Sequence, residues 1–210
     1  MKIYTKAGDD GTTGLLYGGR VAKDSERPEA NGAIDEAQAA LGVARAHCER
    51  GGELDAILVG LQRDLYVLMA EVATAPENRL KLTPGASLVT PAMVDALEGL
   101  IDATSARFDM PTEFVIPGET PEAAWLDVAR TVVRRAERST LAVARTERAS
   151  TERGSTEAST EASTEAADSD VAATGSSVLP YLNRLSDLLW ALARWQEGES
   201  LASRPSRPAG

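Results

Sequence analysis

The chain has 210 residues, a formal net charge of −10 at pH 7, 43% hydrophobic residues and only 4% aromatic residues. This length fits one domain with or without a tail, and hydrophobic residues that are mostly Ala, Leu and Val favour packed helices over a β-sandwich. One cysteine and one histidine exclude an intramolecular disulfide and most histidine-based metal centres, and the acidic charge argues against nucleic-acid binding.

The N-terminal residues 1–24 are rich in Gly, Thr and Asp and are predicted to form a loop with a short strand. They contain no signal-peptide core, and no apolar run of about 18 residues follows, so we expect a cytoplasmic protein that does not bind membranes. Hydrophobic spacing and turn signals predict five helices, over residues 33–48, 53–74, 92–107, 120–145 and 178–198. Five helices joined by loops, without alternating strands, predict an all-α bundle.

A low-complexity segment separates the last two predicted helices. Residues 147–170 include three perfect copies of Ser-Thr-Glu-Ala between positions 155 and 166, and Ala is their only apolar residue type. Because no face of this segment can enter a core, we predict a solvated insert that is disordered or weakly helical. The predicted organisation is a nucleotide-binding arm at 1–24, helices one to four at 25–146, the insert at 147–177, the fifth helix at 178–198 and a flexible tail at 199–210.

The first segment with chemical potential has the sequence TKAGDDGTTG and occupies residues 5–14. Glycines at 8, 11 and 14 allow backbone N–H groups to converge on an anion, and the Lys6 ammonium and threonine hydroxyls add further donors. The segment is not a Walker A loop, because no Gly-Lys-Ser/Thr follows the glycines. Composition alone leaves two alternatives open, a phosphate-binding loop and an ordinary turn-rich arm.

The second segment is the arginine stripe, formed by Arg130, Arg134 and Arg138 together with Glu137 on one face of the predicted fourth helix. Arginine makes up 18 of the 22 basic residues, and a guanidinium binds phosphates or carboxylates through two parallel hydrogen bonds. Like charges four residues apart must be neutralised, by acids on a neighbouring helix or by a polyanion. A solvated basic face is the alternative.

The third segment, YLNRLSD at residues 181–187, begins the predicted fifth helix. Asn183, Ser186 and Asp187 share a polar face, which can bind a nucleotide or simply be solvated. Taken in order, TKAGDDGTT, RRAER at 134–138 and YLNRLSD resemble the PduO-type ATP:cob(I)alamin adenosyltransferases. The resemblance covers residues 3 to about 146 and about 178 to 197.

The resemblance implies a fold, a reaction and a set of ligands. The fold is a five-helix bundle, ferritin-like or cobalamin adenosyltransferase-like, with an N-terminal nucleotide-binding arm. The family assembles as homotrimers with active sites between subunits. Its members transfer the 5′-deoxyadenosyl group of ATP to the Co(I) centre of reduced cobalamin, form adenosylcobalamin and release triphosphate. Mg²⁺ accompanies ATP, and a reductase and an adenosylcobalamin-dependent mutase are implied partners.

The same resemblance assigns roles to individual residues. The residues implied to hold ATP from the arm are Thr5, Lys6, Ala7, Gly8, Thr13, Gly14 and Lys23. The residues implied to meet the triphosphate and its Mg²⁺ are Arg130, Arg134, Arg135, Glu137 and Arg138, of which Arg130, Arg134 and Glu137 are assigned to catalysis and Glu137 to the metal. Asn183 completes the nucleotide site, Asp35 pairs with Arg130 across the subunit interface, and Phe114 holds the corrinoid without its lower axial ligand.

Two alternatives remain beside this enzyme. One is a non-catalytic corrinoid carrier or chaperone on the same fold, against which the intact nucleotide segments argue. The other is a helical scaffold whose arginine stripe docks an acidic partner, which leaves the Gly/Thr-rich arm unexplained. ATP-dependent conversion of reduced cobalamin discriminates between the enzyme and both alternatives.

Overall fold

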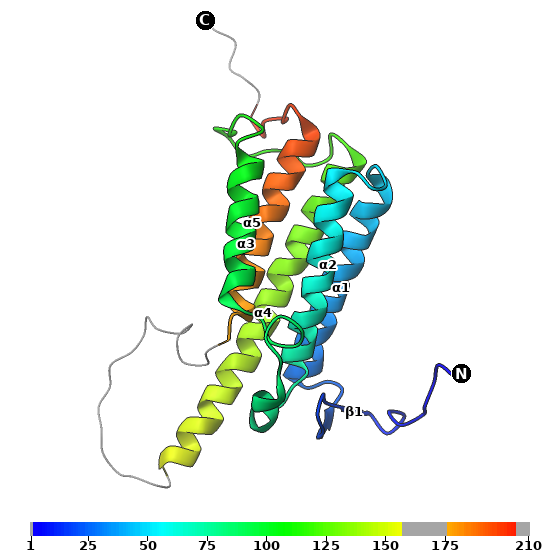
Figure 1. The fold of residues 1–210 in the computed structure, drawn as a ribbon, viewed down its shortest axis with the longest axis vertical. Helices are drawn as coiled ribbons and strands as arrows, with labels where there is room; N and C mark the ends of the chain where they lie inside the picture. Colours follow the sequence, from blue (N-terminus) through cyan, green and yellow to red (C-terminus); the bar gives the residue numbers. More distant parts are fainter. Residues whose placement is uncertain (1, 157–175, 205–210) are drawn as a thin grey trace, which may run out of the picture.

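The computed structural model describes residues 2–156 and 176–204. Five α-helices form an elongated bundle with a small β-hairpin at one end, and the N-terminal residues extend away from that end (Figure 1). The helices are α1 (Glu26–His47), α2 (Glu53–Val72), α3 (Pro91–Ser105), α4 (Pro121–Thr156) and α5 (Val178–Glu197). A 3-10 helix, η1 (Pro76–Lys81), lies in the connection between α2 and α3. The predicted helical bundle is confirmed.

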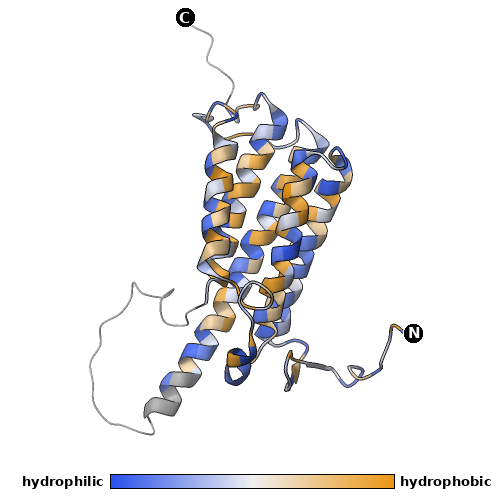
Figure 2. Ribbon diagram, in the orientation of Figure 1, coloured by the Kyte–Doolittle hydropathy of each residue, from blue (hydrophilic) through white to orange (hydrophobic). Residues whose placement is uncertain are grey.

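The bundle is organised around α4, which packs most extensively on α1 and α5, while α2 covers α1 and α3 covers α5. Apolar bands run along the helices and alternate with polar bands (Figure 2). The core is built mainly from alanine and leucine, and small alanines such as Ala37, Ala129 and Ala136 are completely buried. Because alanine side chains are small, they allow α1 and α4 to pack closely along their length.

Two helix boundaries differ from the sequence prediction. Helix α1 begins at Glu26, seven residues before the predicted start at 33, because Pro28 lies in its first turn, where a missing N–H costs no hydrogen bond. Helix α4 continues to Thr156 instead of ending near Arg145. Residues 147–156, predicted to be part of the insert, therefore belong to α4, and residues 157–175 of the predicted insert lie outside the described residues.

Contacts with the first turn of α1 explain the longer α4. The Thr146 hydroxyl donates to Glu26 Oε2 at 2.5 Å, and Glu147 pairs with the Arg27 guanidinium.

We therefore expect replacement of residues 157–170 by a short Gly/Ser linker to leave thermal stability and turnover near wild type. Replacement from 147 onward should instead cost about 3–5 kcal/mol, because it leaves a largely buried Arg27 charge without its partner. Equal melting temperatures for the two replacements would contradict this boundary.

The start of α5 is held to α2 by Tyr181, whose buried hydroxyl donates to Asp64 Oδ2 at 2.8 Å. Partial burial raises the pKa of Asp64, and the Tyr181 hydrogen bond opposes that rise only in part. A carboxyl whose pKa is raised by folding favours the folded state below its usual pKa and loses that contribution as pH rises through the raised value. Asp64→Asn, which still accepts from Tyr181, should therefore melt slightly higher than wild type at pH 7. Thermal melts from pH 3 to 8 should show this difference shrinking on acidification, and a pH-independent difference would contradict it.

Candidate functional site

The arm is built on a hairpin of two short antiparallel strands, β1 (Thr12–Gly14) and β2 (Arg20–Ala22). Arg20 closes the loop before β1, donating from Nη2 to the Ala7 carbonyl at 2.6 Å and from Nε to Thr12 Oγ1 at 3.0 Å. Asp10 accepts from the Thr12 N–H at 2.9 Å, and hydrogen bonds from Thr12 lower the pKa of Asp10. The loop therefore has a defined shape before any ligand binds, and its closure by Arg20 was not predicted from the sequence.

The structure brings Gly8 and Lys23, two of the predicted ATP-binding residues, together. A Cβ on Gly8 would lie 2.9 Å from Lys23 Nζ, so the Lys23 ammonium lies directly beside the Gly8 backbone. Lys6 has a φ of 60°, which is uncommon for a residue other than glycine and occurs mainly where the surrounding structure imposes it. The side chains of Lys6 and Lys23 are exposed, and within residues 2–156 and 176–204 neither ammonium pairs with a carboxylate. The arm therefore presents cationic charge that is available for an anion.

The arginine stripe lies on α4, and its arginines differ in exposure and in hydrogen-bond partners. Arg134 and Arg138 are exposed, and Arg138 Nη1 donates to the Arg134 carbonyl at 2.9 Å. Arg130 is half-buried, and its Nε donates to Asp127 Oδ1 at 3.1 Å. Arg135 forms an ion pair with Glu36 of α1, and its contact with the triphosphate stays a prediction. The stripe thus offers two exposed guanidiniums beside one whose position is fixed by Asp127.

A buried charge network behind the stripe was not predicted from the sequence. Asp127 accepts from Arg194 Nη2 at 2.6 Å through its second oxygen, and Arg194 Nε lies 2.7 Å from Glu197 Oε2. The Arg194 side chain is only 2% exposed, so its charge depends on these two carboxylates. Arg194 also stacks over the Trp190 ring, 5.6 Å from its centroid. The pairing of Asp127 with Arg194 could not be assigned from spacing alone, because Arg194 lies 67 residues away on α5.

The second and third sequence segments meet where α4 contacts α5. Asn183 Nδ2 donates to Glu137 Oε1 at 3.3 Å, and Asn183 Oδ1 accepts from Arg184 Nη1 at 2.6 Å. Within the described residues no cluster of three or more His, Cys, Asp or Glu residues is arranged to hold a metal ion. Mg²⁺ commonly binds one or two carboxylates together with substrate phosphates, and Glu137 alone beside the stripe fits that mode.

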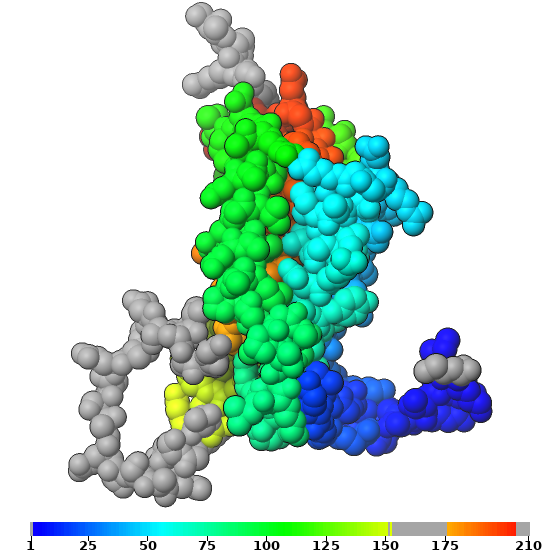
Figure 3. Space-filling view, viewed as in Figure 1, coloured from blue at the N-terminus to red at the C-terminus, as the bar shows by residue number. Residues whose placement is uncertain are grey.

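A groove of about 570 Å³ joins the arm to the bundle. It is lined by Thr13 and Gly14 of the arm, Asp35 of α1 and the exposed Tyr66 ring of α2. In the space-filling view the arm projects beside the lower end of the helices (Figure 3). No ion pair joins Asp35 to Arg130 within the part of the chain that the structure describes, so the predicted pairing between subunits stays a prediction.

Phe114 lies at the opposite end of the bundle in the connection between α3 and α4, and its side chain is 86% exposed. The C-terminal residues hold this connection in place: the Ile116 N–H donates to the Leu201 carbonyl at 2.8 Å, and the Ser203 N–H donates to the Phe114 carbonyl at 2.7 Å. The predicted flexible tail is therefore wrong for residues 201–203, and residues 205–210 lie outside the described residues. The α3–α4 connection and the C-terminal residues together line a pocket of about 490 Å³.

No described helix combines the length and apolar character needed to cross a membrane. Residues 3–196 match the family model for cobalamin adenosyltransferase. A corrinoid adenosyltransferase from Mycobacterium tuberculosis is 40% identical over 195 residues, which span 92% of this chain and 87% of that protein. One from Citrobacter freundii is 37% identical over 196 residues, spanning 93% and 95%. A solved variant of a PduO-type ATP:corrinoid adenosyltransferase from Lactobacillus reuteri, complexed with cobalamin and ATP, aligns with a TM-score of 0.75 at 26% identity, covering 97% of this chain and 100% of that one.

Proposed function

The chain belongs to the cobalamin adenosyltransferase family, and from this premise we propose that it transfers the 5′-deoxyadenosyl group of ATP to the Co(I) centre of a reduced corrinoid. The observation that carries the proposal is the set of exposed cationic groups on preformed supports, in the arm around Gly8 and Lys23 and on α4 around Arg134. Such groups stabilise a polyanion when it binds and when charge develops on it.

The reaction explains which catalytic residues the site needs. Co(I) is the nucleophile and attacks the C5′ carbon of ATP, the C5′–O bond breaks, and triphosphate leaves with the bonding electrons. The cobalt becomes formally Co(III), so no protein side chain has to act as nucleophile. Arg134 and Arg138 stabilise the leaving triphosphate, Glu137 holds its Mg²⁺, and Asn183 orients Glu137 through their hydrogen bond.

We further propose that the active site is completed by a second subunit of a homotrimer. Asp35 lies in the groove beside Thr13 and Gly14, and the exposed side chains Leu16 and Tyr66 surround it. An arginine stripe from a neighbouring subunit would neutralise Asp35 through Arg130 and close the groove over ATP. The product is expected to pass to an adenosylcobalamin-dependent mutase in the cytoplasm, and a reductase is expected to supply Co(I).

The corrinoid is proposed to bind against Phe114 in the site between subunits, where the cobalt can reach the C5′ carbon of ATP. The exposed Phe114 ring offers an apolar surface, and Phe108 in the same connection forms an edge-to-face pair with Trp190 at a centroid distance of 6.0 Å. A wall against the lower face of the corrin excludes water and the axial base from cobalt. Four-coordinate Co(II) is reduced more easily than five-coordinate Co(II), so the wall assists formation of the nucleophile.

The experiment that tests the function is an anaerobic assay with chemically reduced cobalamin, ATP and Mg²⁺. If the protein is this enzyme, the absorbance should change from that of cob(I)alamin to that of adenosylcobalamin. One triphosphate should be released for each adenosylcobalamin formed. The carrier alternative predicts tight binding of preformed adenosylcobalamin with no turnover. Absence of ATP-dependent conversion under these conditions would contradict the proposed activity.

A further inference from the structure

The arm is attached to the bundle at the C-terminal turn of α2. The Leu16 N–H, just after β1, donates to the Ala73 carbonyl at 2.9 Å, and Leu16 forms an isolated parallel bridge with Thr74. The other end of the hairpin continues directly into the first turn of α1, where the Ser25 N–H donates to the Ala22 carbonyl at 3.1 Å. The position of the arm relative to the bundle therefore depends on how well this turn of α2 is held.

One arginine holds that turn. Arg27 Nη1 donates to the carbonyls of Val72 at 2.6 Å and Thr74 at 2.9 Å, the two residues that flank the carbonyl on which Leu16 is held. These carbonyls end α2, so they lack intrahelical donors and carry the negative end of the helix dipole. A fixed cation at this position both satisfies the carbonyls and neutralises the dipole.

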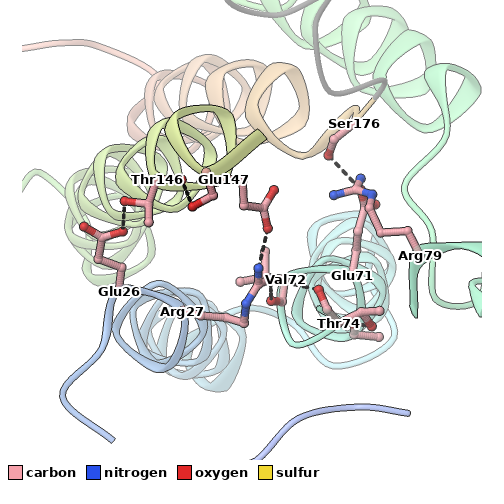
Figure 4. A network of polar contacts seen from close by, with 11 residues as sticks. Glu26, Arg27, Glu71, Val72, Thr74, Arg79, Thr146, Glu147 and Ser176 are labelled. Atoms are coloured by element: carbon pink, nitrogen blue, oxygen red, sulfur yellow. Dashed lines mark hydrogen bonds and ion pairs between the residues drawn. The ribbon is translucent and has the colours of Figure 1, made fainter. Parts of the chain in front are cut away.

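Glu147 in turn holds Arg27. Figure 4 shows the Arg27 side chain reaching from α1 between the end of α2 and Glu147 in the C-terminal part of α4. The two side chains are only 13% and 18% exposed, so their pairing is weakly screened by solvent. The charge of Arg27 is thus directed at the α2 turn by a partner from a third helix.

We propose that Arg27 is a positioning residue for the nucleotide-binding arm: it fixes the turn of α2 that holds Leu16, and Glu147 fixes Arg27. The inference rests on the proposed function, because it assigns the arm to ATP. Arg27 also lines the groove between the arm and the bundle, but its guanidinium is bonded to the α2 carbonyls and to Glu147. If the arm is held in its binding conformation for only a fraction of the time, the apparent affinity for ATP falls by that fraction.

Arg27→Met keeps most of the aliphatic stem and removes the guanidinium. We expect the KM for ATP to rise about tenfold, with kcat changed by less than about twofold and the KM for cob(I)alamin unchanged, because only binding through the arm is weakened. Hydrogen exchange at the amides of residues 12–22 should become faster, while exchange in the core of the bundle stays slow. The exchange measurement reads the arm without any turnover.

Arg45→Met is the matched control, since Arg45 also lies on α1 and pairs with α2, through Asp55 at the opposite end of the bundle. It should leave the KM for ATP and exchange in the arm at wild-type values. Glu147→Gln keeps Arg27 on the carbonyls. It should raise the KM for ATP and speed arm exchange as Arg27→Met does, but by less. It replaces Arg27→Met as the test if that variant does not fold. Arg27→Lys should restore part of the affinity.

Unchanged arm exchange and unchanged KM for ATP in folded Arg27→Met or Glu147→Gln would overturn the positioning role. So would a loss that appears equally in kcat and in both KM values, or equally in Arg45→Met, because it would reflect general destabilisation. If wild type fails to form adenosylcobalamin, the proposed function fails instead. ATP titration and arm exchange would then still decide whether Arg27 orders the arm.

Discussion

Arg134→Ala should lose most of the transfer activity, by about 30- to 1,000-fold, while the protein stays folded. The size follows from removing one charge-assisted contact, worth roughly 2–4 kcal/mol, to the triphosphate in the transition state. Arg134 is exposed on α4, and within the described residues its guanidinium pairs with no carboxylate, so its removal breaks no ion pair of the fold. An exposed arginine contributes little to stability, and the melting temperature should change by no more than a few degrees.

Arg50→Ala provides the control, because Arg50 is also exposed but lies in the loop between α1 and α2. Single-turnover rates with pre-reduced cobalamin should be unchanged in Arg50→Ala and strongly reduced in Arg134→Ala. Arg134→Lys should fall between them, since an ammonium keeps the charge but loses the two-pronged hydrogen bonding of the guanidinium. Near-wild-type turnover in folded Arg134→Ala would remove the stripe from the active site.

Where helix boundaries are set by local signals, the sequence was sufficient to predict them. Thr90 caps α3, accepting from the Met93 N–H, and Pro91 at the first helical position lies one residue before the predicted start at 92. Helices α2 and α5 also end within two residues of their predicted limits. The larger error at the end of α4 occurs where distant contacts override local composition. The polar run after Arg145 stays helical where Thr146 and Glu147 reach α1, and no periodicity within the segment contains that information.

In the candidate site, too, local sequence was informative and long-range contacts were not predicted. The sequence identified residues by their chemistry, and the structure brings some of them together, as with Asn183 and Glu137, which are 46 residues apart. The groups that fix their positions were missed, because their value depends on partners in other elements. The residues around Arg20 in the sequence do not indicate that its side chain closes the loop at Ala7. The apolar residues around Arg194 likewise do not indicate its ion pair with Asp127.

The second large effect is expected for Phe114. A core phenylalanine would cost about 3–5 kcal/mol on truncation to alanine, but the Phe114 side chain is 86% exposed and leaves no cavity when removed. Phe114→Ala should therefore keep a melting temperature close to that of wild type. Its loop should also keep its shape, because the tail holds it through the backbone groups of Phe114 and Ile116, which the substitution leaves unchanged.

Without the ring, water or the lower axial base regains access to cobalt, so Co(II) becomes harder to reduce. Activity from Co(II) with a reductase should fall by an order of magnitude or more, since a shift of about 59 mV in a one-electron potential is tenfold in the reduced fraction. Activity from chemically prepared Co(I) should fall less, because that substrate bypasses the reduction. Magnetic circular dichroism in the presence of ATP should show four-coordinate Co(II) in wild type and its loss in Phe114→Ala. An undiminished four-coordinate signal in the variant, combined with a melting temperature many degrees lower, would make Phe114 a packing residue and move the corrinoid site elsewhere.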